Sequence, residues 1–247
     1  MKFKIVIPTY NTEKWIARCL HSVKTQVYQD FECIVFNDAS TDNTGQAIDN
    51  YFANFPDDRF TVVHNENNRK ALANIVDGFK RLNTKDDPES VLMVIDGDDY
   101  LFCEYVLALV AQVYENNNCL LTYGNHVHWP TGAKSNCMPF PKHVIENNSY
   151  REHKFVASHL RTFKSKLWNN INDADLRDTD GEYFRTGWDV AFMIPMLEMS
   201  GGNFLFVPNV LYVYNRINPI SDDVIYNSDQ GRVDRLVRTR KKYEVLK

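Results

Sequence analysis

The 247-residue sequence lacks a long apolar run, closely spaced cysteines and an excess of basic residues. A membrane-spanning helix needs about 20 consecutive apolar residues, whereas the apolar run near the N-terminus stops at Pro8. We therefore expect that run to be a strand and not a signal peptide. No C-x-x-C pair occurs among the five cysteines, which are Cys19, Cys33, Cys103, Cys119 and Cys137. This spacing favours reduced thiols in a cytosolic compartment over a disulfide framework.

The charge of the chain argues against a nucleic-acid partner. The formal net charge is -4, so the protein has no overall positive field of the kind that attracts nucleic acid. Hydrophobic residues make up 44% of the chain, which is enough for one sizeable core. With no internal repeat and no low-complexity linker, we expect a single domain.

Strand-like and helix-like segments alternate through the first half of the chain. Short β-rich runs cover residues 2–7, 31–36, 60–64 and 91–95, and apolar residues at helical spacing fall within 13–26, 47–52, 71–82 and 105–114. This alternation predicts an α/β fold with a mainly parallel central sheet and right-handed crossovers.

The second half is less regular. We expect loops over 126–149, an amphipathic helix over 188–199 that ends at Gly201-Gly202, and an extended pair of strands over 204–215. The segment from Gly231 to Lys247 has seven Lys/Arg against two Asp/Glu. A basic segment of this kind is most simply a solvated helix, although it would also suit an anionic membrane surface or a partner protein.

Three polar clusters follow strands of the predicted sheet, namely Thr9–Asn11, Asn37–Asp42 and Asp96–Asp99. In open parallel sheets ligands bind beyond the carboxyl ends of the strands. We therefore expect these clusters to share one crevice.

The segment VLMVIDGDDYLF brings three carboxylates together directly after an apolar run. In an extended chain Asp96 and Asp98 project to the same side, and Gly97 lets a ligand approach the backbone closely. Hard oxygen ligands suit Mg²⁺ or Mn²⁺. The alternative is a helix N-cap, because Asp favours that position and a helix follows. Asp99 could have such a structural role in either case.

Asp38 lies in the polar turn NDASTDNT, where Ser40, Thr41 and Asp42 suit helix capping. Helix capping accounts for Asp38 less well than for these three residues, and the Asp38 carboxylate could accept an N–H from a nucleobase. Arg69 and Lys70 come before a predicted helix, where the dipole is also positive. A diphosphate would relieve this, but solvated surface charge is the simpler interpretation.

Asp189 follows Trp188 near the start of another predicted helix. It could cap the helix or, if the helix lines the crevice, act as a general base. His126 and His128 share a face of a possible strand at metal-ligand spacing, but without a third ligand a packed pair is favoured. His159 is equally ambiguous.

The motifs IPTYN, NDASTDNT, DGDDYL and WD…E, in this order, resemble those of a family 2 glycosyltransferase with the GT-A (Rossmann-like) fold. The resemblance covers about residues 1–215 and is strongest through Phe102. It divides the single domain into a nucleotide-sugar half (1–123), an acceptor and catalytic-base half (124–215) and a C-terminal extension (216–247).

The resemblance also implies a role for individual residues. Thr9 and Asp38 would contact the base, usually uracil, and Asp96 the ribose. Asp98 would bind the Mn²⁺ or Mg²⁺ that bridges the diphosphate, with His159 as a weaker metal-ligand candidate. Asp189 would be the catalytic base, although Trp188 stands where the family often has Glu. Arg69 would lie near the nucleotide, in a segment that usually reads N-x-G.

The predicted activity is inverting transfer of a sugar from a nucleotide donor, most simply a UDP-sugar, to a hydroxyl of a glycan or other acceptor. We expect the acceptor to be selected by residues 125–200. One alternative is a nucleotidyltransferase that makes sugar nucleotides, but the first strand leads into PTYN and not into a Gly- and Arg-rich loop. The other is a non-catalytic nucleotide-binding module. The expected location is cytoplasmic, with peripheral membrane contact through the basic segment as an option.

Overall fold

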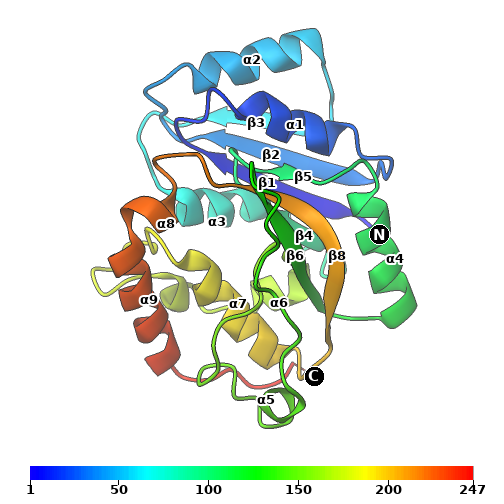
Figure 1. The fold of residues 1–247 in the computed structure, drawn as a ribbon, viewed down its shortest axis with the longest axis vertical. Coiled ribbons are helices and arrows are strands. Elements are labelled where there is room, and N and C mark those ends of the chain that lie inside the picture. The colour runs from blue at the N-terminus through cyan, green and yellow to red at the C-terminus, as the bar shows by residue number, and fades with distance from the viewer. Residues whose placement is uncertain (247) are drawn as a thin grey trace.

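The structure is a computed structural model that describes residues 1–246, apart from the side chains of Asp222 and Asp223. The residues described form one eight-stranded sheet with the order β3-β2-β1-β4-β7-β6-β8-β5. Helices cover both of its faces (Figure 1). The strands are β1 (Phe3–Thr9), β2 (Phe31–Asn37), β3 (Phe60–His64), β4 (Val91–Val94), β5 (Tyr100–Leu101), β6 (Leu121–Trp129), β7 (Thr162–Lys164) and β8 (Phe204–Asn215).

The first half of the chain forms the parallel part of the sheet, as predicted. β1 pairs in parallel with β2 and with β4, and β2 pairs in parallel with β3. The connecting helices are α1 (Ile16–Lys24), α2 (Thr44–Asn54) and α3 (Ala71–Arg81), and α4 (Val106–Asn117) follows β5. The α/β fold class and its mainly parallel sheet are therefore confirmed.

Two apolar cores lie on opposite faces of the sheet. All seven residues of β1 are buried, so alternate side chains enter alternate cores. Ile5 and Ile7 pack with buried residues of α1, α2 and α4, whereas Val6 packs with α3 and the later helix α7 (Trp188–Met199). A Cβ at Gly78 of α3 would lie 2.7 Å from a methyl of Val6, so this glycine allows the helix to approach the sheet closely.

The second half contains more regular structure than we predicted. Residues 126–129 belong to β6, and Lys142–Glu146 forms the short helix α5, so the expected loop over 126–149 was wrong in these places. The expected pair of strands over 204–215 is the single strand β8. Its pairing with β6 jumps from Val207 to Val210, which passes Pro208 in a bulge. A proline has no N–H for the ladder, and the bulge accommodates it.

Helix α7 has the predicted bounds but not the predicted amphipathic character. All of its residues except Asp189 are buried. A helix that is apolar on every side lies inside the protein, and α7 forms a large part of one core. After it, Gly201 and Gly202 adopt positive φ angles of 59° and 85°, which end the helical path.

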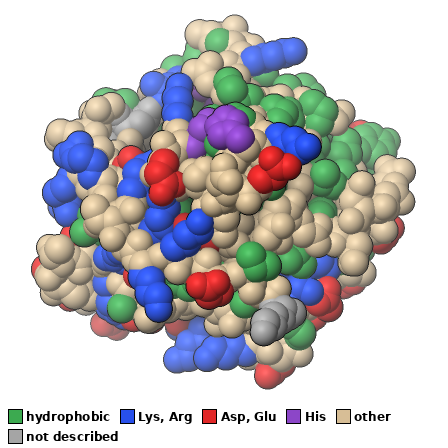
Figure 2. Space-filling model, turned by 90° about the horizontal axis from the view of Figure 1, so that it is seen from below, with side chains coloured by type: hydrophobic (Ala, Val, Ile, Leu, Met, Phe, Trp, Pro, Cys, Tyr) green, Lys and Arg blue, Asp and Glu red, His purple; other side chains and the backbone are tan. Residues whose placement is uncertain are grey.

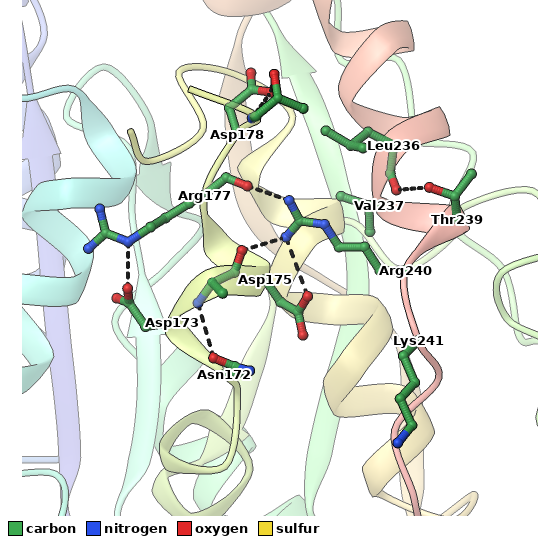
Figure 3. Close-up of polar contacts among 12 residues, drawn as sticks. Asn172, Asp173, Asp175, Arg177, Asp178, Leu236, Val237, Thr239, Arg240 and Lys241 are labelled. Carbon is green, nitrogen blue, oxygen red and sulfur yellow. Dashed lines mark hydrogen bonds and ion pairs between the residues drawn. The ribbon is translucent and has the colours of Figure 1, made fainter. Parts of the chain in front are cut away.

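The basic C-terminal segment is built into the fold and is not simply a solvated helix. The C-terminal extension consists of α8 (Asp222–Ile225), α9 (Asn227–Thr239) and an extended strap over residues 240–246, and the basic segment from Gly231 onward covers the later part of α9 and the strap. Val233 and Val237 of α9 are buried. The guanidinium of Arg240 bonds the carbonyl groups of Ala174 and Arg177 and lies 3.5 Å from Asp175 (Figure 3). Lys247 lies outside the described residues.

Other basic side chains of this segment are also paired. Arg232 contacts Asp178 and Asp229, and Arg238 contacts Asp234. On the face seen in Figure 2, Lys and Arg side chains are scattered among acidic and uncharged ones. Within residues 1–246, no helix has the length and apolar character needed to cross a membrane.

Candidate active site

A cleft of about 430 Å³ opens at the carboxyl ends of β1, β2 and β4. The prediction that the three polar clusters share one crevice is confirmed, because residues of all three line it. The walls include Pro8, Thr9, Tyr10, Asn11, Thr12, Asp38, Asn68, Lys70, Asp96, Gly97, Asp98, Asp99, His159, Arg161, Arg185, Trp188, Asp189, Tyr214, Asn218, Ile220, Ser221, Ile225, Tyr226 and Gln230.

The loops after β1 and β2 are held together by side-chain hydrogen bonds. The backbone N–H of Asn11 donates to Ser40 Oγ at 3.0 Å, and Asn11 Oδ1 accepts the N–H of Thr41 at 2.8 Å. Asp42 accepts the N–H of Thr44 at the start of α2 at 2.9 Å. Asp42 thus satisfies one N–H at the helix start, although the N-cap residue Asn43 makes no side-chain capping bond. These hydrogen bonds fix one wall of the cleft.

Gly97 packs directly against Thr9. A Cβ at position 97 would lie 2.2 Å from Thr9 Oγ1 and 2.4 Å from Thr9 Cβ. The Gly97 N–H also donates to the carbonyl of Pro8 at 3.1 Å. The glycine in DGDD is therefore required for the close approach of two strand ends, a contact within the protein itself.

Asp38 lines the cleft, but its carboxylate already accepts hydrogen bonds. Oδ1 accepts from the N–H of Arg69 and from Asn65 Nδ2, and Oδ2 accepts from the N–H of Lys70, each at 2.8 Å. The buried Asp38 carboxylate thus places a negative charge near the start of α3, where the sequence suggested only an external diphosphate or solvated surface charge. A nucleobase N–H would have to share an oxygen that is already engaged.

Arg69 and Lys70 differ in their relation to the cleft. Lys70 contributes to its lining, whereas Arg69 is not among the described lining residues. The Arg69 guanidinium lies 3.3 Å from Asp77, so only its backbone reaches Asp38. Any contact of the Arg69 side chain with a nucleotide remains a prediction.

The DGDD carboxylates do not cap a helix. α4 begins at Val106, beyond β5, and has no side-chain cap. Asp99 Oδ1 accepts the N–H of Asn215 at 2.7 Å, and Asp98 Oδ2 accepts the side-chain amide of Asn218 at the same distance. Asp99 therefore has a structural role, anchoring the end of β8, and Asp98 holds the segment that follows it.

Burial makes the charged forms of these three carboxyls costly. Desolvation raises the pKa of Asp96, against the effect of Arg161. Desolvation and the neighbouring Asp96 charge raise the pKa of Asp98 to about 6. Desolvation and both neighbours also hold the pKa of Asp99 well above its ordinary value. The site would gain stability from a bound cation.

Asp189 faces the cleft from the first turn of α7. Its Oδ2 accepts a hydrogen bond from Arg161 Nη1 at 2.9 Å, and its side chain is 29% exposed. Arg161 Nη2 lies 2.6 Å from His159 Nε2, which lies 3.6 Å from Asp96 Oδ2. A chain of polar contacts thus runs from Asp189 through Arg161 and His159 to Asp96.

His126 and His128 form a packed pair, as favoured from the sequence. Their Nε2 atoms are 3.3 Å apart, and the ring of His126 also contacts those of His159 and Tyr214. Burial and the neighbouring imidazoles lower the pKa of His126 to about 3, and burial also lowers that of His128. Among the described side chains, which do not include those of Asp222 and Asp223, no group of three or more His, Cys, Asp or Glu is suited to a metal.

The DGDD residues nevertheless suit a hard divalent cation. Asp96 and Asp98 offer carboxylate oxygens beside one another, and desolvation, together with the Asp96 charge in the case of Asp98, raises the pKa of each carboxyl. Mg²⁺ and Mn²⁺ commonly use one or two carboxylates and complete their coordination with phosphate and water. His159 suits this role less well, because its Nε2 faces the Arg161 guanidinium.

Sequence reasoning missed Arg161, Asn218 and the Arg185–Tyr226 pair. The Arg185 guanidinium lies 4.7 Å from the centre of the Tyr226 ring at the cleft. Asn218 and Arg161 carry no motif, and their partners are distant in the chain. Arg161 could have been suspected from the sequence because it comes two residues after His159, a candidate site residue.

A model of the family described as "Glycosyl transferase family 2" matches residues 4–179. Among proteins of similar sequence, the glycosyltransferase GlyG of Streptococcus pneumoniae is 25% identical over 226 residues, which are 86% of this chain and 70% of GlyG. The chondroitin synthase of Pasteurella multocida is 25% identical over 236 residues, which are 94% of this chain and 22% of that enzyme.

Solved structures share the fold at lower sequence identity. The S. aureus TarS 1-349 structure in complex with UDP-GlcNAc matches with a TM-score of 0.69 and 19% identity, over 96% of this chain and 65% of that one. The mannosyltransferase PcManGT from Pyrobaculum calidifontis, in complex with GDP-Man and Mn²⁺, matches with a TM-score of 0.62 and 16% identity, over 98% and 66%. This chain therefore spans less than two thirds of several proteins that it resembles.

Proposed function

The chain belongs to glycosyl transferase family 2 and has the GT-A fold, and from this we propose that it transfers a sugar from a nucleotide donor to a hydroxyl group, with inversion at the anomeric carbon. One observation supports the proposal most. The cleft contains the DGDD carboxylates at one strand end and, on α7, a partly exposed carboxylate with one oxygen engaged by an arginine. Donor carboxylates and a candidate base in one cleft are what such a transfer requires.

The donor would bind across the ends of β1, β2 and β4. In the proposal Thr9 and Asp38 contact the base and Asp96 the ribose. The diphosphate would lie toward Asp98, with Lys70 and Arg69 on the neighbouring side. UDP is the proposed nucleotide, which agrees with the UDP-GlcNAc complex of TarS, although the PcManGT complex contains GDP-Man.

Asp98, with Asp96 beside it, would hold Mn²⁺ or Mg²⁺. When bound, such a cation stabilises the negative charge of the departing diphosphate as a Lewis acid. The protein would contribute the carboxylates of Asp96 and Asp98 as ligands. Asn218 would give up its hydrogen bond to Asp98 Oδ2 when that oxygen binds the cation. His159 remains the weaker candidate for this site.

Asp189 would take the proton of the acceptor hydroxyl. The acceptor oxygen then forms a bond to the anomeric carbon while the bond from that carbon to the phosphate oxygen breaks, and the nucleoside diphosphate leaves with the electron pair. Attack from the face opposite the leaving group inverts the anomeric centre, and positive charge develops on the ring, as in glycoside chemistry. The proton ends on Asp189, from which solvent can remove it.

The acceptor is proposed to be a glycan or another hydroxyl compound, bound by residues between 125 and 200, which include Arg185 and Trp188 of the cleft wall. A role in polysaccharide biosynthesis agrees with the chondroitin and hyaluronan synthases of Pasteurella multocida among the similar proteins. A cytoplasmic location is proposed from the five free thiols. Contact with an anionic membrane has less support, because Arg232, Arg238 and Arg240 are paired within the fold.

The test is calorimetric titration of the protein with UDP, GDP and dTDP, each with Mn²⁺ and with EDTA. We expect metal-dependent binding of UDP that is lost in Asp98→Asn. Binding of a nucleoside triphosphate in preference to all diphosphates would favour a nucleotidyltransferase. Metal-dependent UDP binding without release of UDP from any UDP-sugar would favour a non-catalytic module.

A further inference from the structure

Arg161 is the central residue of a polar chain that crosses the cleft. It lies just before β7, on the segment that also carries His159, and its side chain is 5% exposed. One guanidinium nitrogen bonds Asp189 Oδ2, and another lies 2.6 Å from His159 Nε2. The guanidinium carbon is 5.9 Å from the centre of the Trp188 ring. Arg161 is therefore fixed on several sides and has little freedom to move.

The contact with Asp189 engages only one of its oxygens. Oδ2 accepts the hydrogen bond from Arg161, and none of the described side-chain or backbone groups donates a hydrogen bond to Oδ1. A carboxylate held through one oxygen keeps its orientation and retains the other oxygen as an acceptor. Because Asp189 is 29% exposed and lines the cleft, that second oxygen is available to an incoming hydroxyl.

The contact with His159 fixes the other end of the chain. Arg161 donates to Nε2, so the imidazole accepts there and carries its proton on Nδ1. The His159 ring stacks on Tyr212 at 4.6 Å with an angle of 7° between the planes. The Tyr212 hydroxyl accepts the N–H of Asp96 at 3.2 Å. The position of Arg161 is thus tied to the carboxylate turn on the opposite wall.

We propose that Arg161 is a positioning residue that orients Asp189 for proton transfer, and that it sets the distance between this base and the donor-binding carboxylates through His159. The inference rests on the proposed function. Its physical basis is that a displacement of about 1 Å in a reacting group can lower the rate about 100-fold. A guanidinium with two fixed contacts prevents such a displacement.

A second buried arginine provides a matched control. Arg151 contacts Glu198 at 2.6 Å and 2.8 Å, and its side chain is 8% exposed, close to the 5% of Arg161. Neither Arg151 nor Glu198 is among the residues that line the cleft. If each guanidinium only supported the fold, its loss should therefore have the same effect on stability and on kcat at both positions. An effect on proton transfer should appear only at Arg161.

The experiment compares Arg161→Lys, Arg161→Gln and Arg151→Lys. The rate of UDP release is measured against donor concentration, at a temperature well below the Tm of each variant, with the UDP-sugar that binds in calorimetry. We expect kcat to fall about 10-fold in Arg161→Lys and about 100-fold in Arg161→Gln, with the KM for the donor little changed. Arg151→Lys should lower the Tm and leave both kcat and the KM for the donor in place.

The variants at position 161 change no other charged group near Asp189. His159 stays neutral because burial and Arg161 hold its pKa well below the ordinary value. The remaining charged side chains of the cleft are unchanged in the variants, namely Asp38, Lys70, Asp96, Asp98, Asp99 and Arg185. In an Asp189→Asn background, Arg161→Gln should cause no further loss of kcat, because Arg161 acts through Asp189.

A readout without turnover separates this inference from the proposed function. Nitrogen NMR of ¹⁵N-histidine-labelled protein should show the proton of His159 on Nδ1 and not on Nε2, as the contact with Arg161 requires, and Arg161→Gln should alter this signal. An additive loss of kcat in the double variant, or equal losses of kcat in Arg151→Lys and Arg161→Lys, would overturn the inference. Failure of UDP to bind the unaltered protein would instead overturn the proposed function, while the NMR result would still test the geometry.

Discussion

Two buried arginine–carboxylate pairs hold different parts of this molecule. Arg151 and Glu198 lie in the half built around α7, where the Glu198 side chain is fully buried. Arg161 and Asp189 lie at the cleft, where the Asp189 side chain is 29% exposed. The two pairs have the same chemistry, but their surroundings differ.

Every strong acceptor in the first pair is used. Glu198 accepts from two nitrogens of Arg151 and from the N–H of Tyr243, at 2.6 to 3.0 Å. Arg151 also donates to the carbonyl groups of Val237 and Lys241. This pair therefore fastens the C-terminal strap to α7. In the second pair, Oδ1 of Asp189 accepts no hydrogen bond from the described groups. A network in which every polar group is paired stabilises the fold, whereas a free carboxylate oxygen is available for chemistry.

The largest expected effect is on activity and follows from Asp189→Asn. Replacement of a general base by an amide should lower kcat by about 10² to 10⁴-fold. Donor binding, measured by calorimetry with UDP and Mn²⁺, should be unchanged, because Asp98 and Asp38 are intact. The matched variant Glu198→Gln, assayed well below its Tm, should keep its kcat. Equal losses of kcat in both variants would remove the distinction between the two pairs.

The next largest effect is on stability and follows from the same Glu198→Gln variant. The change leaves the Arg151 charge buried without a carboxylate, which costs about 3–5 kcal/mol of folding free energy. For a chain of this size the Tm should fall by roughly 6–20 °C. Thermal unfolding followed by circular dichroism provides the measurement. A fall of less than a few degrees would mean that the strap is not held by this pair.

The sequence predicted the parallel half and the carboxylates of the cleft for different reasons. Strong apolar periodicity and turn residues define β1 to β4, and the DGDD turn and Asp189 each belong to a recognisable motif. β6 was partly missed because Gly124, Asn125 and His126 interrupt its apolar pattern, and its extended form depends on pairing with β8. Pairing across the fold, and not local preference, decides such a strand.

The residues that complete the site could not be predicted from local patterns. Arg161 and Asp189 are 28 positions apart, and Asp98 and Asn218 are 120 apart. These contacts arise only when the later segments fold back over the sheet. The burial of α7 on every side has the same origin. The sequence pattern predicted one solvent-exposed face for this helix, but other helices and the C-terminal strap cover that face.

A smaller effect concerns pH and the carboxylates on the donor side of the cleft. The pKa of Asp98 is raised from 3.8 to about 6, so the folded protein binds this proton more tightly than the unfolded chain. Stability therefore falls as pH rises through that interval and is greater at about pH 5 than at pH 7. We expect the Tm of metal-free protein to rise by a few degrees on acidification, and less so in Asp98→Asn. A Tm that falls steadily from pH 7 to pH 5 would contradict the raised pKa.

The smallest effect is expected at a third pair, Arg232 with Asp178, which extends the comparison to the surface. The Arg232 side chain is 43% exposed and also contacts Asp229. Exposed pairs contribute about 0–1 kcal/mol, because water solvates both charges well when they separate. Arg232→Gln should therefore lower the Tm by no more than about 2–4 °C and leave kcat unchanged. A loss as large as that of Glu198→Gln would show that the α9 contacts, and not burial of the charge pair, determine how firmly the C-terminal segment is held.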